Sequence, residues 1–305
     1  MNNETKGTIL ALMAAVISGI AIPANKLFIV SLDPTVFTAV RSVIIGTVFF
    51  FISLHQSRPT ISRFKKASWA SLLAIAVVGG ALAFLLFFNG LSLTTAGKGA
   101  FLHKTLPLWT AVLAFVFLKE RITKIALYAL IAMFLGIVAL YFTQITPGDL
   151  WKDPQLGDLL VLGAAFLWAV ETIIAKKAMV DGETNFVVSF ARMFFGGVIL
   201  FGIALLSGKA DAMLALSIAQ WTYVLASTAM LFGYVLCWYW AIKKVNASKA
   251  TSLLLLAPVV SLIGGVLLFN EHVSVQQLVG SAAILAGAYF VSHEKSESLR
   301  MQHTI

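Results

Sequence analysis

Charged residues are scarce in this chain of 305 residues, and cysteine is almost absent. Only 11% of the residues are charged, whereas 60% are hydrophobic and the mean hydropathy is +0.93. A soluble domain covers its surface with roughly a quarter of charged side chains, so this composition excludes an ordinary soluble protein. The single cysteine, Cys237, excludes an internal disulfide framework.

Catalytic motifs are missing as well. The sequence contains no HExxH zinc motif, no GxSxG nucleophile motif and no GxxxxGK[ST] phosphate-binding loop. We therefore predict no catalytic residue, no metal site and no cofactor. The net charge of +9 does not require a nucleic acid partner, because basic loops beside anionic membrane lipid account for it.

Long apolar segments take up most of the chain. Each is close to the ~20 residues that cross the hydrocarbon core as a helix, and no strand-like alternation is present. We therefore predict an all-α integral membrane protein with ten transmembrane helices. The predicted spans are 7–30, 34–54, 69–92, 97–118, 123–143, 157–179, 186–206, 219–243, 248–269 and 273–292. The segment 210–218 is too short to cross and is expected at the interface.

The basic residues predict the orientation of these spans. With the N-terminus inside, most of the 22 lysines and arginines fall in cytoplasmic segments, whereas the outer loops clearly hold only Lys152 and Lys209. The positive-inside rule then places both termini in the cytoplasm. The expected location is the plasma membrane, or the inner membrane of a cell that has two.

The two halves of the sequence repeat each other at an offset of about 150 residues. The matched residues are Gly7 and Gly157, Lys26 and Lys176, Arg41 and Arg192, Gly46 and Gly197, Lys98 and Lys249, Pro107 and Pro258, Glu120 and Glu271, and Gly136 and Gly287. Because each half holds an odd number of spans, the second half enters the membrane from the opposite side, so the five-helix repeats are inverted.

This repetition predicts the domains and the class of function. We expect a first repeat at 1–143, an outer linker at 144–156, a second repeat at 157–292 and a cytoplasmic tail at 293–305. Inverted repeats are typical of secondary transporters, because two matched halves can open a central site to one side and then to the other. A channel-like facilitator or a membrane scaffold is the alternative.

Three motifs resemble those of a known family. They are "PLWTAVLAFVFLKER" at the end of the fourth span, "PVVSLIGGVLLFNEH" at the end of the ninth, and "LGAAFLWAVETIIAKKAM" in the sixth. With ten spans in two repeats, they make the chain similar to the EamA domains of the drug/metabolite transporter superfamily. The resemblance implies export of a small metabolite, such as an amino acid or a related solute, without ATP.

Glu171 and Arg192 are charged residues expected at matching depth in neighbouring spans. A rise of ~1.5 Å per residue places them ~12 and ~10 Å from the inner ends of their spans. An isolated charge in the membrane costs ~2.5–3.5 kcal/mol, so the two side chains are expected to pair. The pair either fixes the packing or forms a substrate or proton site. We favour the structural role for Arg192 and leave both open for Glu171.

The outer half contains cations without matching carboxylates. Arg41, His103 and Lys104 lie at a common depth of ~8–12 Å from the outer ends of their spans. They either face a wet cavity and bind an anionic or carboxylate-bearing substrate, or they reach the headgroups and form structural pairs.

Further candidates line the same predicted cavity. Tyr234 and Trp238 share a helical face, and Asn89 and Trp109 are additional lining residues. Pro107 and Pro258 occupy matched positions and are candidate gate hinges; ordinary packing is the alternative for all of these residues. The expected partners are a small-molecule substrate and membrane lipid, with a homodimer left open.

Overall fold

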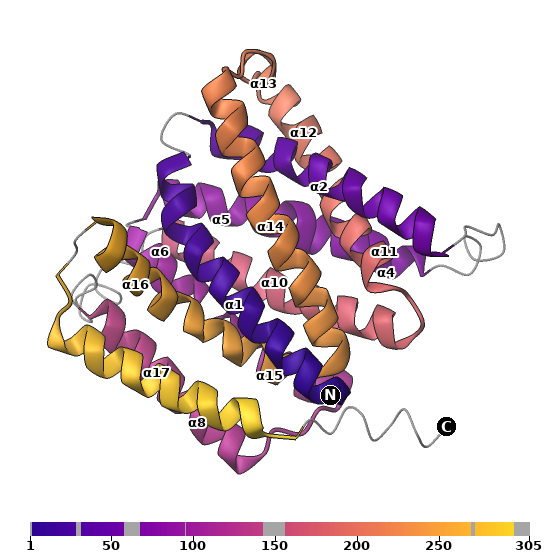
Figure 1. Cartoon of the computed structure of the whole chain (residues 1–305). Coiled ribbons are helices and arrows are strands. Elements are labelled where there is room, and N and C mark those ends of the chain that lie inside the picture. Colours follow the sequence, from indigo (N-terminus) through magenta and orange to yellow (C-terminus); the bar gives the residue numbers. More distant parts are fainter. Residues whose placement is uncertain are drawn as a thin grey trace.

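The computed structural model describes residues 2–28, 32–57, 68–94, 96–142, 156–269 and 272–295. All regular elements in these residues are helical (Figure 1). The elements are α1 (Asn3–Phe28), α2 (Pro34–Ser57), α4 (Trp69–Ile75), η2 (Ala76–Leu82), α5 (Ala83–Ser92), α6 (Ala96–His103), α7 (Leu106–Leu118), α8 (Lys124–Tyr141), α10 (Leu156–Val180), α11 (Asn185–Phe190), η3 (Ala191–Phe195), α12 (Gly196–Leu206), α13 (Ala210–Leu214), α14 (Ile218–Lys244), α15 (Ala247–Leu253), η4 (Leu254–Leu256), α16 (Ala257–Phe269) and α17 (Val275–His293).

Within the described residues, ten helical segments are long and apolar enough to cross a membrane, which confirms the predicted number of spans. Four of them are composite. The third span joins α4, η2 and α5; the fourth joins α6 and α7; the seventh joins α11, η3 and α12; and the ninth joins α15, η4 and α16. The short α13 lies in the connection that was expected at the interface, whereas most of the predicted linker lies outside the described residues.

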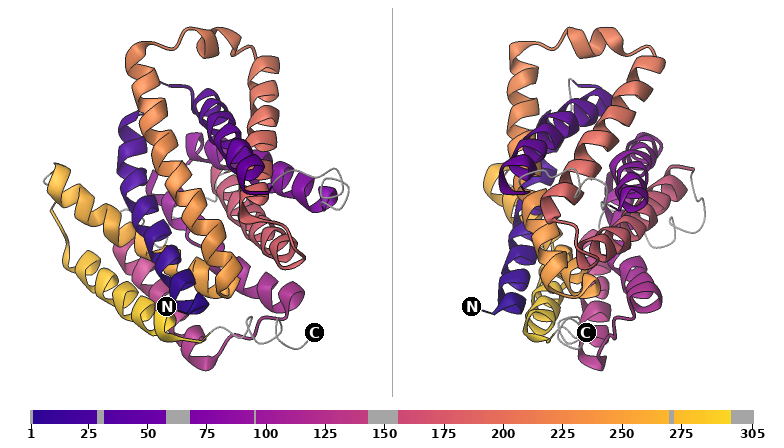
Figure 2. Two further views of the ribbon diagram at one scale, coloured as in Figure 1. Left: turned by 45° about the vertical axis from the view of Figure 1, so that its right-hand side comes forward. Right: turned by 90° about the vertical axis from the view of Figure 1, so that its right-hand side faces the viewer.

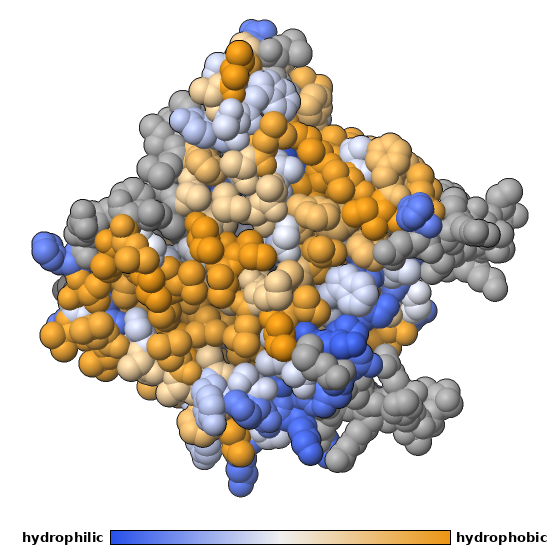
Figure 3. All heavy atoms as spheres, viewed as in Figure 1, coloured by the Kyte–Doolittle hydropathy of each residue, from blue (hydrophilic) through white to orange (hydrophobic). Residues whose placement is uncertain are grey.

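The outer surface of the bundle is apolar, as a lipid-facing surface requires. Phe115, Phe117 and Tyr128 are more than 60% exposed, which would be costly in water over so large an area. Figure 3 shows a continuous apolar surface over α1, α16 and α17, with hydrophilic residues gathered near the N-terminus. We call the end of the bundle where α1 begins and α14 ends the basic face, after Lys243 and Lys244.

Helix packing follows the inverted repeat. In the first repeat α1 packs along α14 and α16 of the second, and in the second repeat α10 packs along α5 and α7 of the first. The two remaining major pairs, α8 with α17 and α2 with α12, each join matched spans of the two repeats (Figures 1 and 2). The two halves therefore exchange equivalent contacts.

Two glycines show this equivalence at atomic detail. A Cβ atom added to Gly136 would lie 2.6 Å from the carbonyl oxygen of Gly280, and one added to Gly287 would lie 2.8 Å from that of Ala129. Gly280 and Ala129 are themselves matched at the offset of the repeat. Only glycine allows α8 and α17 to approach so closely at both points.

The fourth and ninth spans are both interrupted in the middle. The fourth is helical to His103, turns at Lys104 and Thr105, and restarts one residue before Pro107. The ninth passes through the 3₁₀ segment η4 and restarts as α16 one residue before Pro258. Proline lacks an N–H and its ring crowds the carbonyl four residues earlier, so both helices break at the matched position.

Candidate functional site

Glu171, Arg192 and Tyr239 form a buried polar cluster between α10, η3 and α14. The Arg192 Nη1 atom lies 3.7 Å from Glu171 Oε2 and donates a hydrogen bond of 3.3 Å to the hydroxyl of Tyr239. That hydroxyl donates to Glu171 Oε1 at 2.5 Å. Since Glu171 is 1% exposed and Arg192 is 7% exposed, each of the two charges depends on its partners in this cluster.

Two π-helical segments meet at this cluster, η3 of the seventh span and η2 of the third. η3 contains Arg192, and η2 contains Gly79 and Gly80. A Cβ atom on Gly79 would lie 2.2 Å from Glu171 Cγ, and one on Gly80 would lie 2.3 Å from the carbonyl oxygen of Arg192. The glycines therefore allow the charged pair to fit against η2. Interruptions of this type are frequent at functional sites.

An aromatic cluster lies one turn along α10 from Glu171. The ring of Trp168 lies 5.3 Å from those of Phe84 and Phe87 and 5.1 Å from that of His103, between centroids. Trp168 also donates a hydrogen bond to the carbonyl oxygen of Gly79. His103 is therefore held among aromatic rings beside the polar cluster.

Arg41 and Lys104 are buried cations that differ from Arg192 in having no carboxylate partner among the described residues. Arg41 is 5% exposed and Lys104 is 6% exposed, and neither has an ion-pair partner among the described residues. Arg41 Nη1 donates to Ser227 Oγ at 3.1 Å, and its guanidinium lies 4.8 Å from the ring centroid of Phe37. The interior thus holds positive charge that the described chain does not neutralise.

The other predicted site residues lie apart from these two groups or at their edge. Tyr234 and Trp238 stack at 6.2 Å between centroids, in agreement with the shared helical face. Trp109 is 39% exposed and packs against Phe166, and Asn89 is also exposed. The structure therefore does not bring Asn89 and Trp109 into the buried polar cluster.

Glu120, which was not among the predicted site residues, makes a second buried network. Its Oε1 atom lies 2.6 Å from Lys176 Nζ and accepts a hydrogen bond of 3.0 Å from the N–H of Ala247. Its Oε2 atom accepts from the N–H and the hydroxyl of Ser248, both at 3.4 Å. The recurrence of Glu120 in the repeat is the signal that marks it in the sequence.

Ion pairs made by two matched lysines lie at the two ends of the bundle. At the basic face Lys249 Nζ lies 3.2 Å from Glu4 Oε1, and at the opposite face Lys98 Nζ lies 3.8 Å from Asp158 Oδ2. Lys249 and Lys98 are matched residues, and each pair joins the start of a broken span to the start of the first span of the other repeat. The fold therefore has one such contact at each face.

A further ion pair lies at the opposite face, outside the spans. Asp33 caps α2 by accepting hydrogen bonds from the N–H groups of Thr35 and Val36, and its Oδ2 atom lies 2.8 Å from Lys209 Nζ. Burial favours a higher pKa for Asp33, but Lys209 and the two N–H groups outweigh it and hold the pKa below its usual value.

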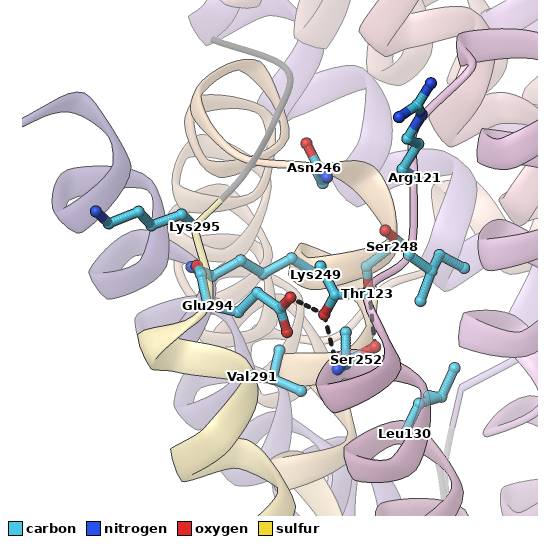
Figure 4. A pocket seen from close by; sticks show the side chains of 12 residues that line it. Arg121, Thr123, Leu130, Asn246, Ser248, Lys249, Ser252, Val291, Glu294 and Lys295 are labelled. Carbon is cyan, nitrogen blue, oxygen red and sulfur yellow. Dashed lines mark hydrogen bonds between the residues drawn. The ribbon is translucent and has the colours of Figure 1, made fainter. Parts of the chain in front are cut away.

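A small hollow lies at the basic face, between the start of α8, α15 and the end of α17 (Figure 4). Lys249 and Glu294 point into it, and Lys249 donates to the backbone carbonyl of Glu294. Thr123 lies at one side of the hollow, where its hydroxyl donates a hydrogen bond to the Glu294 carboxylate. None of the predicted substrate residues is among those that line this hollow.

Among the described residues, no group of three or more His, Cys, Asp and Glu side chains is placed to hold a metal ion.

Comparison with known proteins gives one consistent result. The model of the EamA-like transporter family matches residues 5–142 and again residues 155–293. An uncharacterized transporter of Methanothermobacter thermautotrophicus is 24% identical over 93% of this chain and 85% of its own length. One of Archaeoglobus fulgidus is 27% identical over 91% and 95%, respectively. A solved structure with 17% identity superposes with a TM-score of 0.75 over 93% of this chain and 96% of its own, which shows a shared fold.

Proposed function

The chain belongs to the EamA-like transporter family, and from this premise we propose that it is a secondary transporter that exports a small metabolite, an amino acid or a related organic solute, across the plasma membrane. The observation that carries the proposal is the pair of matched breaks before Pro107 and Pro258, in oppositely oriented repeats. In transporters with inverted repeats, broken helices and buried polar groups form the substrate site near the membrane midplane.

The paired contacts at the two faces support alternating access. Opening the basic face would separate Lys249 from Glu4, and opening the opposite face would separate Lys98 from Asp158. The two lysines are matched residues, although their carboxylate partners are not, so an ion pair broken at one face is offset by an ion pair of the same kind that stays closed at the other. Such a balance favours exchange between two states of similar free energy.

Counterflow in proteoliposomes tests this function. Vesicles preloaded with an unlabelled metabolite are diluted into trace labelled metabolite, over a panel of amino acids and related acids. A carrier that alternates between two states accumulates label transiently and shows trans-stimulation. Equilibration without trans-stimulation would identify a channel. No uptake of any panel member, into preloaded or into empty vesicles, would favour a scaffold.

We propose that both termini lie in the cytoplasm, with the basic face inside, because most basic loop residues then follow the positive-inside rule. A reporter enzyme that is active only outside the cytoplasm should be active when fused after residue 150 and silent when fused after residue 298. The reverse pattern would overturn the orientation.

Pro107 and Pro258 are proposed to act as hinges of opposite gates. Alanine at either site would restore a backbone N–H that can bond to the helical segment before the break. One added hydrogen bond stabilises the unbent helix by ~1 kcal/mol, so transport should slow about five-fold while the fold is retained. The two variants should also shift cysteine accessibility toward opposite faces. Pro34→Ala is the matched control, because Pro34 occupies the first position of α2, where its missing N–H has no helical partner. Unchanged rates in both hinge variants would reduce the two prolines to packing kinks.

A further inference from the structure

Three buried polar atoms on one face of α2 lack partners. They are Thr38 Oγ1, Arg41 Nε and Ser42 Oγ, and none of them has a hydrogen-bond partner among the described residues. The three residues are 1%, 5% and 1% exposed, respectively. They follow each other at helical spacing, so their side chains lie on one face of α2. A buried polar atom without a partner costs ~1–3 kcal/mol, so three together on one helix face would be stabilised by a bound group that accepts hydrogen bonds.

Among the described residues, the side chains that bond to Arg41 or cover it are neutral. Ser227 Oγ accepts from Arg41 Nη1 and donates to Asn25 Oδ1 at 2.7 Å, which fixes the guanidinium between α1, α2 and α14. The Phe37 ring covers one face of it. This arrangement orients the guanidinium without supplying a counterion, and its Nε remains available to an acceptor.

The second repeat shows how the matched arginine is neutralised. Arg192, the match of Arg41, is paired with Glu171. At the offset that aligns the first span with the sixth, the position of Glu171 corresponds to Ala21 in the first repeat. The second repeat therefore carries its own carboxylate for the matched arginine, and the first repeat has alanine at that position.

We propose that Thr38, Arg41 and Ser42 form an oxyanion site within the membrane that binds the carboxylate of the transported solute. Arg41 supplies the charge and an N–H, the two hydroxyls donate to the same group, and Ser227 with Asn25 positions the guanidinium. The solute carboxylate takes the place that Glu171 occupies beside Arg192. This inference rests on the proposed transport function and names its substrate class.

Ligand-induced stabilisation of the purified full-length protein tests the site without a transport assay. Cys237 is the only cysteine and is buried, so its reaction with a maleimide dye reports thermal unfolding. Benzoate, succinate and inorganic phosphate are compared with benzamide and succinamide, which keep the shape of the two carboxylates and lack the charge. We expect at least one carboxylate, and neither amide, to raise the unfolding midpoint of the wild type. Stabilisation by phosphate alone would replace the carboxylate with a phosphoryl group and overturn the stated class.

Variants then assign the effect to Arg41. Arg41→Gln should weaken apparent carboxylate binding about ten-fold or more, since it removes charged hydrogen bonds. Lys119→Gln, which removes an exposed lysine, should bind as the wild type does. Asn25→Asp provides a second readout that loss of folding cannot imitate. It places a carboxylate beside Ser227, so it should raise the midpoint without ligand and abolish the carboxylate effect.

Equal stabilisation of the wild type and Arg41→Gln by carboxylates would overturn the site. So would a wild type that no carboxylate stabilises. Neither result alters the counterflow behaviour of the wild type, which decides the proposed transport function separately.

Discussion

Replacing Glu171 with alanine is expected to lower the free energy of unfolding by about 3–5 kcal/mol, because it leaves a buried guanidinium without its carboxylate. The hydroxyl of Tyr239 would lose its acceptor at the same time, and the space against Gly79 would be left unfilled. Unfolding in increasing concentrations of SDS, followed by the reaction of the buried Cys237 thiol, measures the change.

Three further variants separate the contribution of the ion pair to the free energy of unfolding from that of the Tyr239 hydroxyl and from nonspecific effects of substitution. Asp181→Asn removes an exposed carboxylate just beyond the end of the same helix and should change stability by less than ~0.5 kcal/mol. Tyr239→Phe removes only the hydroxyl and should cost ~1–3 kcal/mol. Replacing Glu171 and Arg192 together with leucine and methionine should restore most of the loss. Full stability of Glu171→Ala with loss of counterflow would contradict the structural role and make Glu171 a substrate or proton site.

The spans and their inverted repetition could be predicted because each depends on local or periodic features of the sequence. Hydrophobic length predicts a span independently of its neighbours. Matches such as Gly136 with Gly287 need no structure to be seen, and the structure shows them in equivalent contacts. The pairing of Glu171 with Arg192 was also predictable, because a short loop joins their spans and places them at one depth.

Partners from distant spans could not be predicted in this way. Tyr239 is 68 residues from Glu171, and no periodicity distinguishes its hydroxyl from the neighbouring aromatic side chains. The π-helical segments η2 and η3 arise where two spans pack glycine against backbone, and their sequences carry no period of their own. Asn89 and Trp109 share the aromatic and polar character of lining residues, but only the three-dimensional packing shows that they are exposed.

Glu120 and Lys176 should respond unequally to substitution, although they form one ion pair. Without Lys176, Glu120 keeps the N–H groups of Ala247 and Ser248 as donors. Without the Glu120 carboxylate, Lys176 keeps, among the described residues, only the carbonyl oxygen of Val245, which accepts at 2.6 Å, and the N–H groups at the start of α15 lose their charged acceptor. A carboxylate with backbone donors tolerates burial far better than an ammonium beside a single carbonyl.

We therefore expect Glu120→Gln to lower the free energy of unfolding by about 3–5 kcal/mol, and Lys176→Met by less than half as much. The same contact joins the first repeat to the sixth and ninth spans at the basic face, so its loss should also expose that face. A cysteine introduced at Ser248 in a Cys237→Ala background should react faster with a water-soluble maleimide in Glu120→Gln than in Lys176→Met. The Cys237→Ala, Ser248→Cys chain with Glu120 and Lys176 intact provides the reference rate. Equal destabilisation by the two single substitutions would contradict the asymmetry, because it would mean that the backbone donors do not sustain the Glu120 carboxylate alone.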